Sequence, residues 1–241
     1  MNERIETMAK DPLGVMLRQY YEGDLAAFLT VWSDSMEMAP MYGKSMLRSL
    51  AEMDELEKCA LANCRGRVLD VGAGSGCHSL VLQDRGLEVE AVDISPGCVA
   101  LMRQRGVHRV RHANVFTVAG QRFDTVLMLM NGIGLCGSIG GLHDFLGKLD
   151  DLVKPGGQLI VDSTDLTAQF LAIGEQVYDD AGYCGETEFV MVYKGLRSDP
   201  FSWLYIDYPL LAGICKEHGY RCELVMSFAE GRYLARISST A

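Results

Sequence analysis

The middle of the chain alternates between continuous apolar segments and segments whose apolar residues recur at helical spacing. Continuous apolar segments of this kind, bounded by turn residues, predict buried strands. They are VLDV at 68–71, VEAVDI at 89–94, FDTVLMLM at 123–130 and QLIVDS at 158–163, with RVRHANVF at 109–116 as a weaker strand. Because helical segments separate these strands, the pattern indicates a parallel sheet covered by helices on both faces.

Capping residues mark the ends of the predicted helices. Ser95 is suited to an N-cap, Pro96 to the first helical position and Gly106 to the closing turn. Helical spacing also predicts a helix from about Cys77 to Gly86 and another over 142–153. KPGG at 154–157 predicts a turn, so the strands and helices alternate regularly from Arg67 onward.

The two ends of the chain differ from this pattern. Residues 1–65 contain no good strand but two helical patterns, at roughly 12–30 and 44–62. After a variable stretch, TEFVMVYKG and SDPFSWLYID predict a hairpin over 187–206. A helix with Pro209 in its first turn and Gly219 at its end follows, and then RCELVMSF and GRYLARI predict a terminal antiparallel pair. We therefore expect one domain with additions.

Three glycines in five positions follow the first predicted strand. Gly72, Gly74 and Gly76 permit positive φ and a close approach of a ligand to the backbone. A strand, a glycine turn and a helix form a nucleotide crevice at the carboxyl end of a parallel sheet. The dinucleotide pattern would place its third glycine at Cys77, while Asp93 can accept ribose hydroxyls in either class of ligand. The turn alone does not decide between the classes.

Five motifs in order decide the class of ligand. They are VLDVGAGSG, AVDIS, HANVF, FDTVLMLMNGIG and LVKPGGQLIVD, and together they cover roughly residues 66–165. This set resembles the class I S-adenosylmethionine-dependent methyltransferases, and more broadly those that act on small molecules. The resemblance implies S-adenosylmethionine as the cofactor. It also implies a three-layer Rossmann-like α/β fold with a seven-stranded, mostly parallel sheet whose last strand is antiparallel.

The resemblance also implies a role for each matching residue. Asp70 and the loop Gly72, Ala73, Gly74 and Gly76 would face the methionine end of the cofactor. Asp93 would hold the ribose hydroxyls and Ile94 would pack against the adenine. Asn114 stands where the family often has an Asp that binds the adenine amino group, and Val115 follows it. Asn131 would lie near the methionine moiety and the substrate.

Composition and charge limit the classes of substrate and partner that the protein is expected to bind. The net charge of −10, from 22 basic and 32 acidic residues, disfavours a nucleic-acid substrate. After the fourth strand, NGIG lacks the prolines and the aromatic residue of the enzymes that methylate nucleic-acid amines. No apolar run reaches the roughly 20 residues of a membrane span. The eight cysteines include no C-x-x-C pair, so we expect free thiols, no metal site and a cytoplasmic protein.

The sequence shows no clear catalytic base. The cofactor carries the reactivity, and a base is needed only for a nucleophile that arrives protonated. The catalytic residue is therefore unknown, and substrate contacts are hypotheses with structural alternatives. The candidates are Tyr42, His143, Asp162, Trp203 and Tyr205.

Two other functions stay open at this stage. A non-catalytic S-adenosylmethionine-binding module, such as a regulator, is compatible with the missing base. A nicotinamide oxidoreductase is disfavoured by Cys77 and the KPGG turn. We expect residues 1–65 to form a helical cap on a methyltransferase domain at 66–241, with 32–45 as a gate, in a monomer or homodimer acting on a small molecule.

Overall fold

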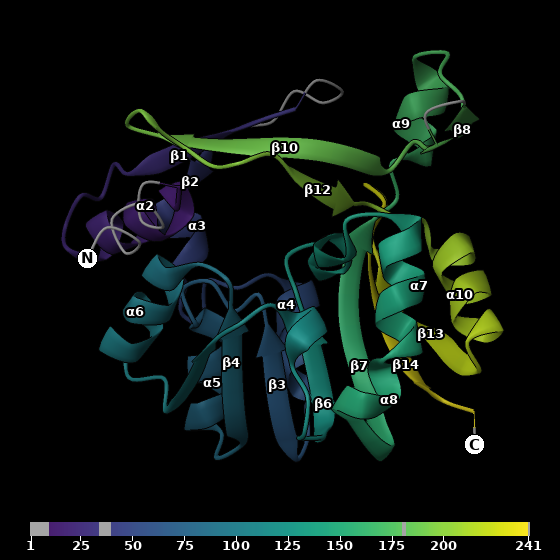
Figure 1. Cartoon of the computed structure of the whole chain (residues 1–241), viewed down its shortest axis with the longest axis horizontal. Coiled ribbons are helices and arrows are strands. Elements are labelled where there is room, and N and C mark those ends of the chain that lie inside the picture. The colour runs from purple at the N-terminus through teal and green to yellow at the C-terminus, as the bar shows by residue number, and fades with distance from the viewer. Residues whose placement is uncertain (1–9, 34–39, 180–181, 241) are drawn as a thin grey trace. The chain divides into compact units, whose positions relative to one another are not determined.

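The computed structural model describes residues 10–33, 40–179 and 182–240. Its main sheet has seven strands in the order β13-β14-β7-β6-β3-β4-β5 (Figure 1). These strands are β3 (Arg67–Val71), β4 (Glu88–Asp93), β5 (Arg109–His112), β6 (Phe123–Met128), β7 (Val153–Thr164), β13 (Tyr220–Ser227) and β14 (Arg232–Ser239). Pairs β4–β5 and β6–β7 are parallel, whereas β14 is antiparallel to both β7 and β13. The predicted Rossmann-like α/β fold, with its antiparallel last strand, is confirmed.

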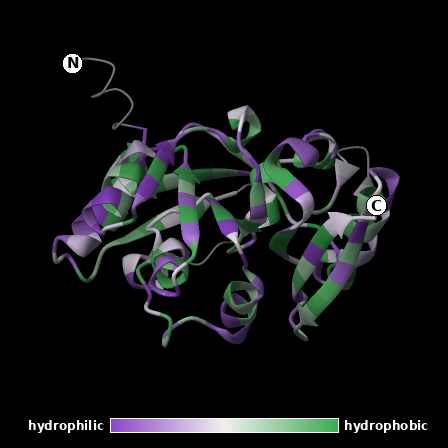
Figure 2. Cartoon of the chain, turned by 90° about the horizontal axis from the view of Figure 1, so that it is seen from below, coloured by the Kyte–Doolittle hydropathy of each residue, from purple (hydrophilic) through white to green (hydrophobic). Residues whose placement is uncertain are grey.

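The chain divides into two compact units, which we describe separately. The first holds the residues up to Asp54, Leu69–Thr117 and Glu188–Phe201. The second holds Glu55–Val68, Val118–Thr187 and Ser202 onward. Hydrophobic and hydrophilic residues share nearly every element in Figure 2.

In the first unit, α5 (Cys77–Asp84) and α6 (Pro96–Gln104) pack on β4. Ser95 is the N-cap of α6, and its hydroxyl accepts the Cys98 N–H at 2.9 Å, as predicted. The expected strand at 109–116 ends at His112, because residues 115–117 turn into the 3₁₀ helix η1 (Val115–Thr117).

The N-terminal prediction of helices without strands is wrong in part. The first helix, α2 (Pro12–Tyr21), is followed by a turn at Gly23, where φ is 117°. A strand β1 (Phe28–Trp32) then alternates exposed and buried side chains, a period of two that competes with the helical pattern. The second predicted helix is divided into α3 (Gly43–Met46) and α4 (Glu55–Asn63), and β2 (Met41–Tyr42) precedes it.

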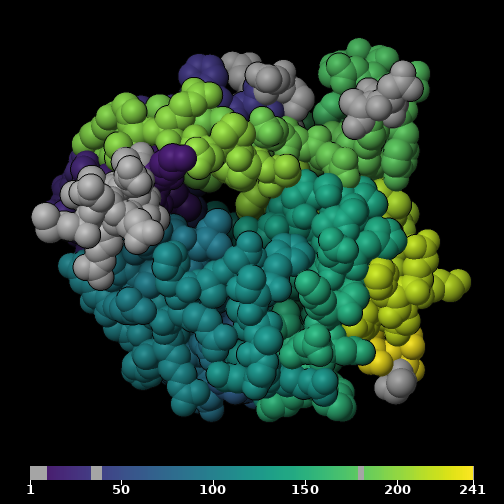
Figure 3. Space-filling view, in the orientation of Figure 1, coloured from purple at the N-terminus to yellow at the C-terminus, as the bar shows by residue number. Residues whose placement is uncertain are grey.

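The predicted hairpin at 187–206 is confirmed. Strand β10 (Glu186–Tyr193) pairs with β11 (Leu196–Arg197) and with β12 (Phe201–Leu204). It also pairs antiparallel with β1, through Thr30 opposite Val192 and Trp32 opposite Val190. Part of the β10–β11 hairpin, in lime green, lies at the surface in Figure 3.

In the second unit, two further predictions change. The helix expected over 142–153 consists of α7 (Ile139–Gly147) and α8 (Leu149–Leu152), which meet at Lys148. KPGG lies inside β7 as a bulge rather than in a separate turn, because Phe123 pairs with Val153 but Thr125 pairs with Gln158. The helix α10 (Tyr208–Glu217) and the antiparallel β13–β14 pair are as predicted. Short elements α9 (Thr167–Ala172), η2 (Gly132–Cys136), β8 (Tyr178–Asp179) and β9 (Gly182–Tyr183) complete this unit.

Candidate cofactor-binding site

The glycine loop lies between β3 and α5 in the first unit. Gly72, Gly74 and Gly76 have φ of 65°, 54° and 78°, a region that L side chains rarely adopt. The N–H groups of Gly72 and Ala73 donate to the Val92 carbonyl at 2.9 and 3.2 Å. The loop is therefore tied to the end of β4 by its own backbone.

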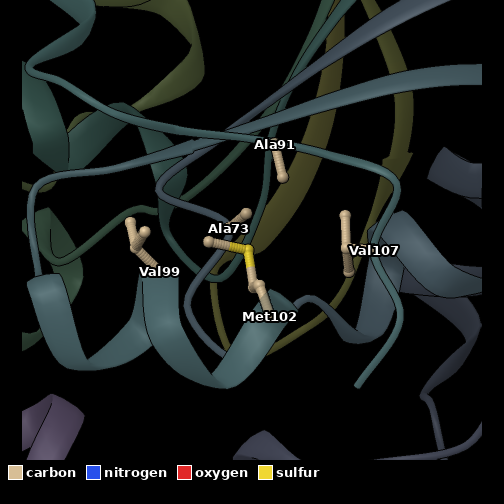
Figure 4. Packing of buried hydrophobic residues seen from close by; sticks show 5 residues of the cluster. All are labelled: Ala73, Ala91, Val99, Met102 and Val107. Atoms are coloured by element: carbon tan, nitrogen blue, oxygen red, sulfur yellow. The ribbon is translucent and has the colours of Figure 1, made fainter. Parts of the chain in front are cut away.

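Ala73 packs the glycine loop against the hydrophobic core. It is buried with Ala91, Val99, Met102 and Val107, and Figure 4 shows these side chains gathered around the sulfur of Met102. A Cβ on Gly76 would lie 2.9 Å from both Met102 and Val107, so packing as well as φ requires glycine there. The loop is closely packed on this side.

Gly74 has different surroundings. A Cβ built on it would meet no described atom closer than the Met46 methyl at 3.7 Å. Packing therefore does not require a glycine at position 74. We call the space beside Gly74 the Gly74 cradle, because a ligand that lies close to the backbone there would leave no room for a side chain.

Asp93 stands at the end of β4 beside this cradle. Its carboxylate accepts the Gly74 N–H and the Ser95 N–H, both at 2.8 Å, one on each oxygen. Burial raises the pKa of Asp93, repulsion from Asp11 and Asp70 adds to the increase, and the two amides oppose it. Each oxygen can accept a second hydrogen bond. The carboxylate thus suits a vicinal diol.

Asp70, on β3, is more deeply buried and is held by a side chain of α5. Its carboxylate accepts the Ser79 hydroxyl at 2.6 Å, and the residue is only 1% exposed. Burial raises the pKa of Asp70, while the charge of His78 and hydrogen bonds from Ser79 oppose this. A cationic amino group nearby would stabilise the ionised form further.

The residues expected at the adenine lie on the loops after β4 and β5. Ile94 is 65% exposed, an unusual position for an isoleucine that leaves its side chain free to cover a flat apolar ligand. Asn114 is also exposed, and its side-chain oxygen accepts the Phe116 N–H at 3.0 Å. Val115 is buried at the start of η1.

Asn131 lies in the second unit, directly after β6. Met130 and Asn131 both have positive φ, 67° and 56°; asparagine adopts this region readily, whereas it is strained for methionine. The Asn131 side chain accepts the Thr164 hydroxyl at 2.7 Å, and the Asp162 carboxylate accepts the Gly132 N–H at 2.9 Å. Strain of this kind clusters at functional sites.

Two of the aromatic candidates lie in the same unit. The Trp203 indole packs directly on Gly134, where an added Cβ would fall 2.0 Å from the ring. Tyr205 is buried, and burial raises its pKa. A glycine at 134 is therefore needed to seat Trp203.

The remaining substrate candidates already contact other side chains. His143 on α7 has Nδ1 only 2.9 Å from Nε2 of His218, the C-cap of α10. Tyr42 is half exposed and stands 5.4 Å from the Phe28 ring, centroid to centroid. No group of His, Cys, Asp or Glu in the described part of the chain could hold a metal ion.

The sequence did not reveal Asp11 as a member of this region. Its carboxylate binds Ser95 and Gly97, next to Asp93. Asp11 before Pro12 signals only the start of a helix. Nothing in the local pattern shows that the same side chain also reaches residues more than 80 positions away.

A methyltransferase-domain family model matches residues 42–189, more than half of the chain. The chain belongs to the class I S-adenosylmethionine-dependent methyltransferase family. Across 97% of this chain and 96% of the other, it is 38% identical to an S-adenosylmethionine-dependent methyltransferase from Bacteroides fragilis, with a TM-score of 0.87. That protein was solved with S-adenosyl-L-homocysteine.

Curated members of the family match a shorter region. A ubiquinone biosynthesis O-methyltransferase from Azorhizobium caulinodans is 28% identical over 59% of this chain and 60% of its own length. A demethylmenaquinone methyltransferase from Beutenbergia cavernae is 30% identical over 64% of each chain. The match thus spans less than two thirds of these relatives. Within the residues that the structure describes, no helix has the length and apolar character needed to cross a membrane.

Proposed function

We propose that this protein transfers the methyl group of S-adenosylmethionine to a small-molecule acceptor. The observation that carries the proposal is the pairing of the Gly74 cradle with the Asp93 carboxylate at the carboxyl ends of β3 and β4. The cofactor, when bound, supplies an electrophilic methyl group on a sulfonium.

The residues of the first unit fit the cofactor. Asp93 would accept the ribose hydroxyls, and the exposed Ile94 would cover the adenine, with Asn114 and Val115 beside it. Asp70, Gly72, Ala73 and Gly76 would shape the methionine end. This is the assignment that the family resemblance implied, and the geometry of Gly74 and Asp93 supports it.

For the acceptor, we propose contacts from Tyr42, Asp162, Trp203 and Tyr205, and from Asn131 near the methyl group. Support comes from the strained backbone at Met130, next to Asn131, and from Trp203 on Gly134. His143 is not included, because its ring is already paired with His218. Alignment of the acceptor and exclusion of water can supply most of the acceleration, so a base is not required for every acceptor.

Titration calorimetry tests cofactor binding directly. S-Adenosylmethionine or S-adenosylhomocysteine should bind with roughly micromolar affinity, equivalent to about 8 kcal/mol. NAD should not bind. Tight binding of NAD together with no binding of either sulfur compound would sink the proposal.

Activity is tested by S-adenosylhomocysteine release with a panel of small molecules. Quinone-type acceptors are the first to include, because one relative is named for ubiquinone biosynthesis and another for the methylation of demethylmenaquinone. Binding of the cofactor without release on any acceptor would favour the alternative, a non-catalytic regulatory module.

We also propose a cytoplasmic location, because all eight cysteines are free thiols. The oligomeric state, monomer or homodimer, is open to light scattering.

A further inference from the structure

Asp11 serves the N-termini of two helices at once. Its Oδ1 accepts the Gly14 N–H of α2 at 2.9 Å, and its Oδ2 accepts the Gly97 N–H of α6 at 2.8 Å. The Ser95 hydroxyl donates to the same carboxylate at 2.8 Å. Asp11 is only 8% exposed, so these bonds form away from water. A carboxylate at two helix N-termini is favoured by both helix dipoles.

Two glycines allow the helix ends to come this close. A Cβ on Gly14 would lie 2.6 Å from the Gly97 Cα, and a Cβ on Gly97 would lie 2.6 Å from the Gly14 Cα. Neither glycine has a positive φ, so close backbone approach is what requires them. The contact between α2 and α6 is therefore built around the Asp11 carboxylate.

Through Ser95, the same network of hydrogen bonds reaches the carboxylate of Asp93. The Ser95 side chain is fixed between Asp11 and the Cys98 N–H, while its backbone N–H donates to the Asp93 Oδ1 at 2.8 Å. The other oxygen of Asp93 is held by the Gly74 N–H. The orientation of the Asp93 carboxylate thus depends on where Asp11 holds Ser95.

We propose that Asp11 is a positioning residue for the cofactor ribose, acting through Ser95 on the carboxylate of Asp93. The inference rests on the proposed function, since it requires Asp93 to bind the ribose hydroxyls. It assigns a role in cofactor recognition to the N-terminal segment, which lies outside residues 42–189 of the matched family domain.

A purely structural role for Asp11 makes a different prediction. If Asp11 only held α2 against α6, its loss would loosen the unit and weaken every adenosine ligand alike. If it positions Asp93, its loss should weaken a ligand with ribose hydroxyls and spare one without them. The comparison of two ligands separates these roles even when a variant is less stable.

The experiment measures, by calorimetry, the dissociation constants of S-adenosylhomocysteine and of its 2′,3′-dideoxy analogue. In the unmodified protein the analogue should bind about tenfold more weakly, because charge-assisted hydrogen bonds to Asp93 are lost. In Asp11→Asn the parent compound should weaken about fivefold, while the analogue should stay within about twofold. Ser95→Ala should show the same pattern and serves as the second variant if Asp11→Asn does not fold.

Asp199→Asn is the matched control. Asp199 forms an exposed ion pair with Lys10, the residue before Asp11, at 2.9 Å. The same change from Asp to Asn therefore removes an ion pair close to Asp11 and leaves the hydrogen bonds of Ser95 in place. Both ligands should keep their affinities in this variant. Equal weakening of both ligands in Asp11→Asn, or no weakening at all, would overturn the positioning role. An unmodified protein that binds parent and analogue equally would instead overturn the assignment of Asp93.

Discussion

Asp93 and Asp70 are both buried carboxylates, but their surroundings suit them to different tasks. Asp93 accepts two backbone N–H groups that fix its plane, whereas Asp70, on β3, accepts the hydroxyl of Ser79 on α5. Backbone donors cannot rotate away, so Asp93 is preorganised for a second pair of hydrogen bonds. This difference makes Asp93 the stronger candidate for an energetic contact with the ligand.

Replacement of Asp93 by Ala should weaken S-adenosylhomocysteine binding by about tenfold or more, because charge-assisted hydrogen bonds contribute roughly 1.5–3 kcal/mol. Calorimetry on a variant whose circular dichroism matches the parent protein measures this. Asp199→Ala, an exposed aspartate of the same unit, is the control. An unchanged dissociation constant in folded Asp93→Ala would refute the ribose assignment.

Cofactor affinity should fall in acid at a milder pH than an ordinary aspartate would cause. Burial, followed by repulsion from Asp11 and Asp70, raises the pKa of Asp93 above its usual 3.8. A raised pKa means that the carboxylate gains its proton earlier as the pH decreases, and a protonated carboxyl accepts fewer hydrogen bonds. Affinity is therefore complete well above the raised pKa and is lost as the pH falls through it.

Calorimetry at a series of decreasing pH values, over which circular dichroism shows the protein still folded, measures this loss, with the 2′,3′-dideoxy analogue as the reference ligand. The analogue cannot use the Asp93 carboxylate through ribose hydroxyls, so its affinity should change less over the same range. Parallel curves for the two ligands would show that another group titrates.

The loop between β3 and α5 shows how three similar glycines serve different purposes. Gly76 is required by packing against Met102 and Val107, whereas a Cβ on Gly74 would make only an ordinary contact, with Met46 at 3.7 Å. All three glycines have positive φ, so neither their residue type nor their backbone conformation distinguishes them. Only the neighbours that the fold brings to each position distinguish them.

Gly76→Ala should lower the free energy of unfolding by about 2–4 kcal/mol, because left-handed strain adds to a clash in a packed core. Gly74→Ala should lower the free energy of unfolding by only about 1–2 kcal/mol, from backbone strain alone. It should nevertheless weaken the binding of S-adenosylhomocysteine more than Gly76→Ala does. Urea denaturation and calorimetry on both variants test the contrast. The reverse order of stability losses would contradict the packing seen at these positions.

The cofactor should also stabilise the protein against heat. At a ligand concentration of 100 times the dissociation constant, binding to the native state adds about 2.7 kcal/mol. For a chain of this size that corresponds to a rise in Tm of roughly 5–10 °C. Differential scanning fluorimetry with S-adenosylhomocysteine measures the shift, and NAD at the same concentration should produce none. Equal shifts with both ligands would count against a site specific for the sulfur compound.

The N-terminal region shows where sequence patterns reach their limit. Residues 12–30 carry apolar residues compatible with a helix, but the helix ends at Tyr21 and Phe28–Trp32 forms a strand. The strand exists because β10, about 160 residues later, offers it a partner. The predicted gate at 32–45 falls partly on residues 34–39, which lie outside the described residues, so it stays a prediction.

The sequence by itself determined the order of the main-sheet strands and their connecting helices, the glycine loop and the family, but not the short elements α9, β8 and β9. These features depend on local periodicity, capping and short motifs, and such signals are carried by neighbouring residues. The caps at Ser95 and Gly106 and the position of Asp93 could be predicted for the same reason.

Only the tertiary structure decided which side chains meet. It joined Asp11 to Ser95, seated Trp203 on Gly134 and paired His143 with His218. It also left room for a Cβ at Gly74 but none at Gly76. These contacts join residues that are far apart in the chain or depend on such residues, and a pattern read over a few neighbouring positions contains no information about them. Packing and hydrogen bonding across the fold therefore set the fine geometry of the site, while local sequence set its framework.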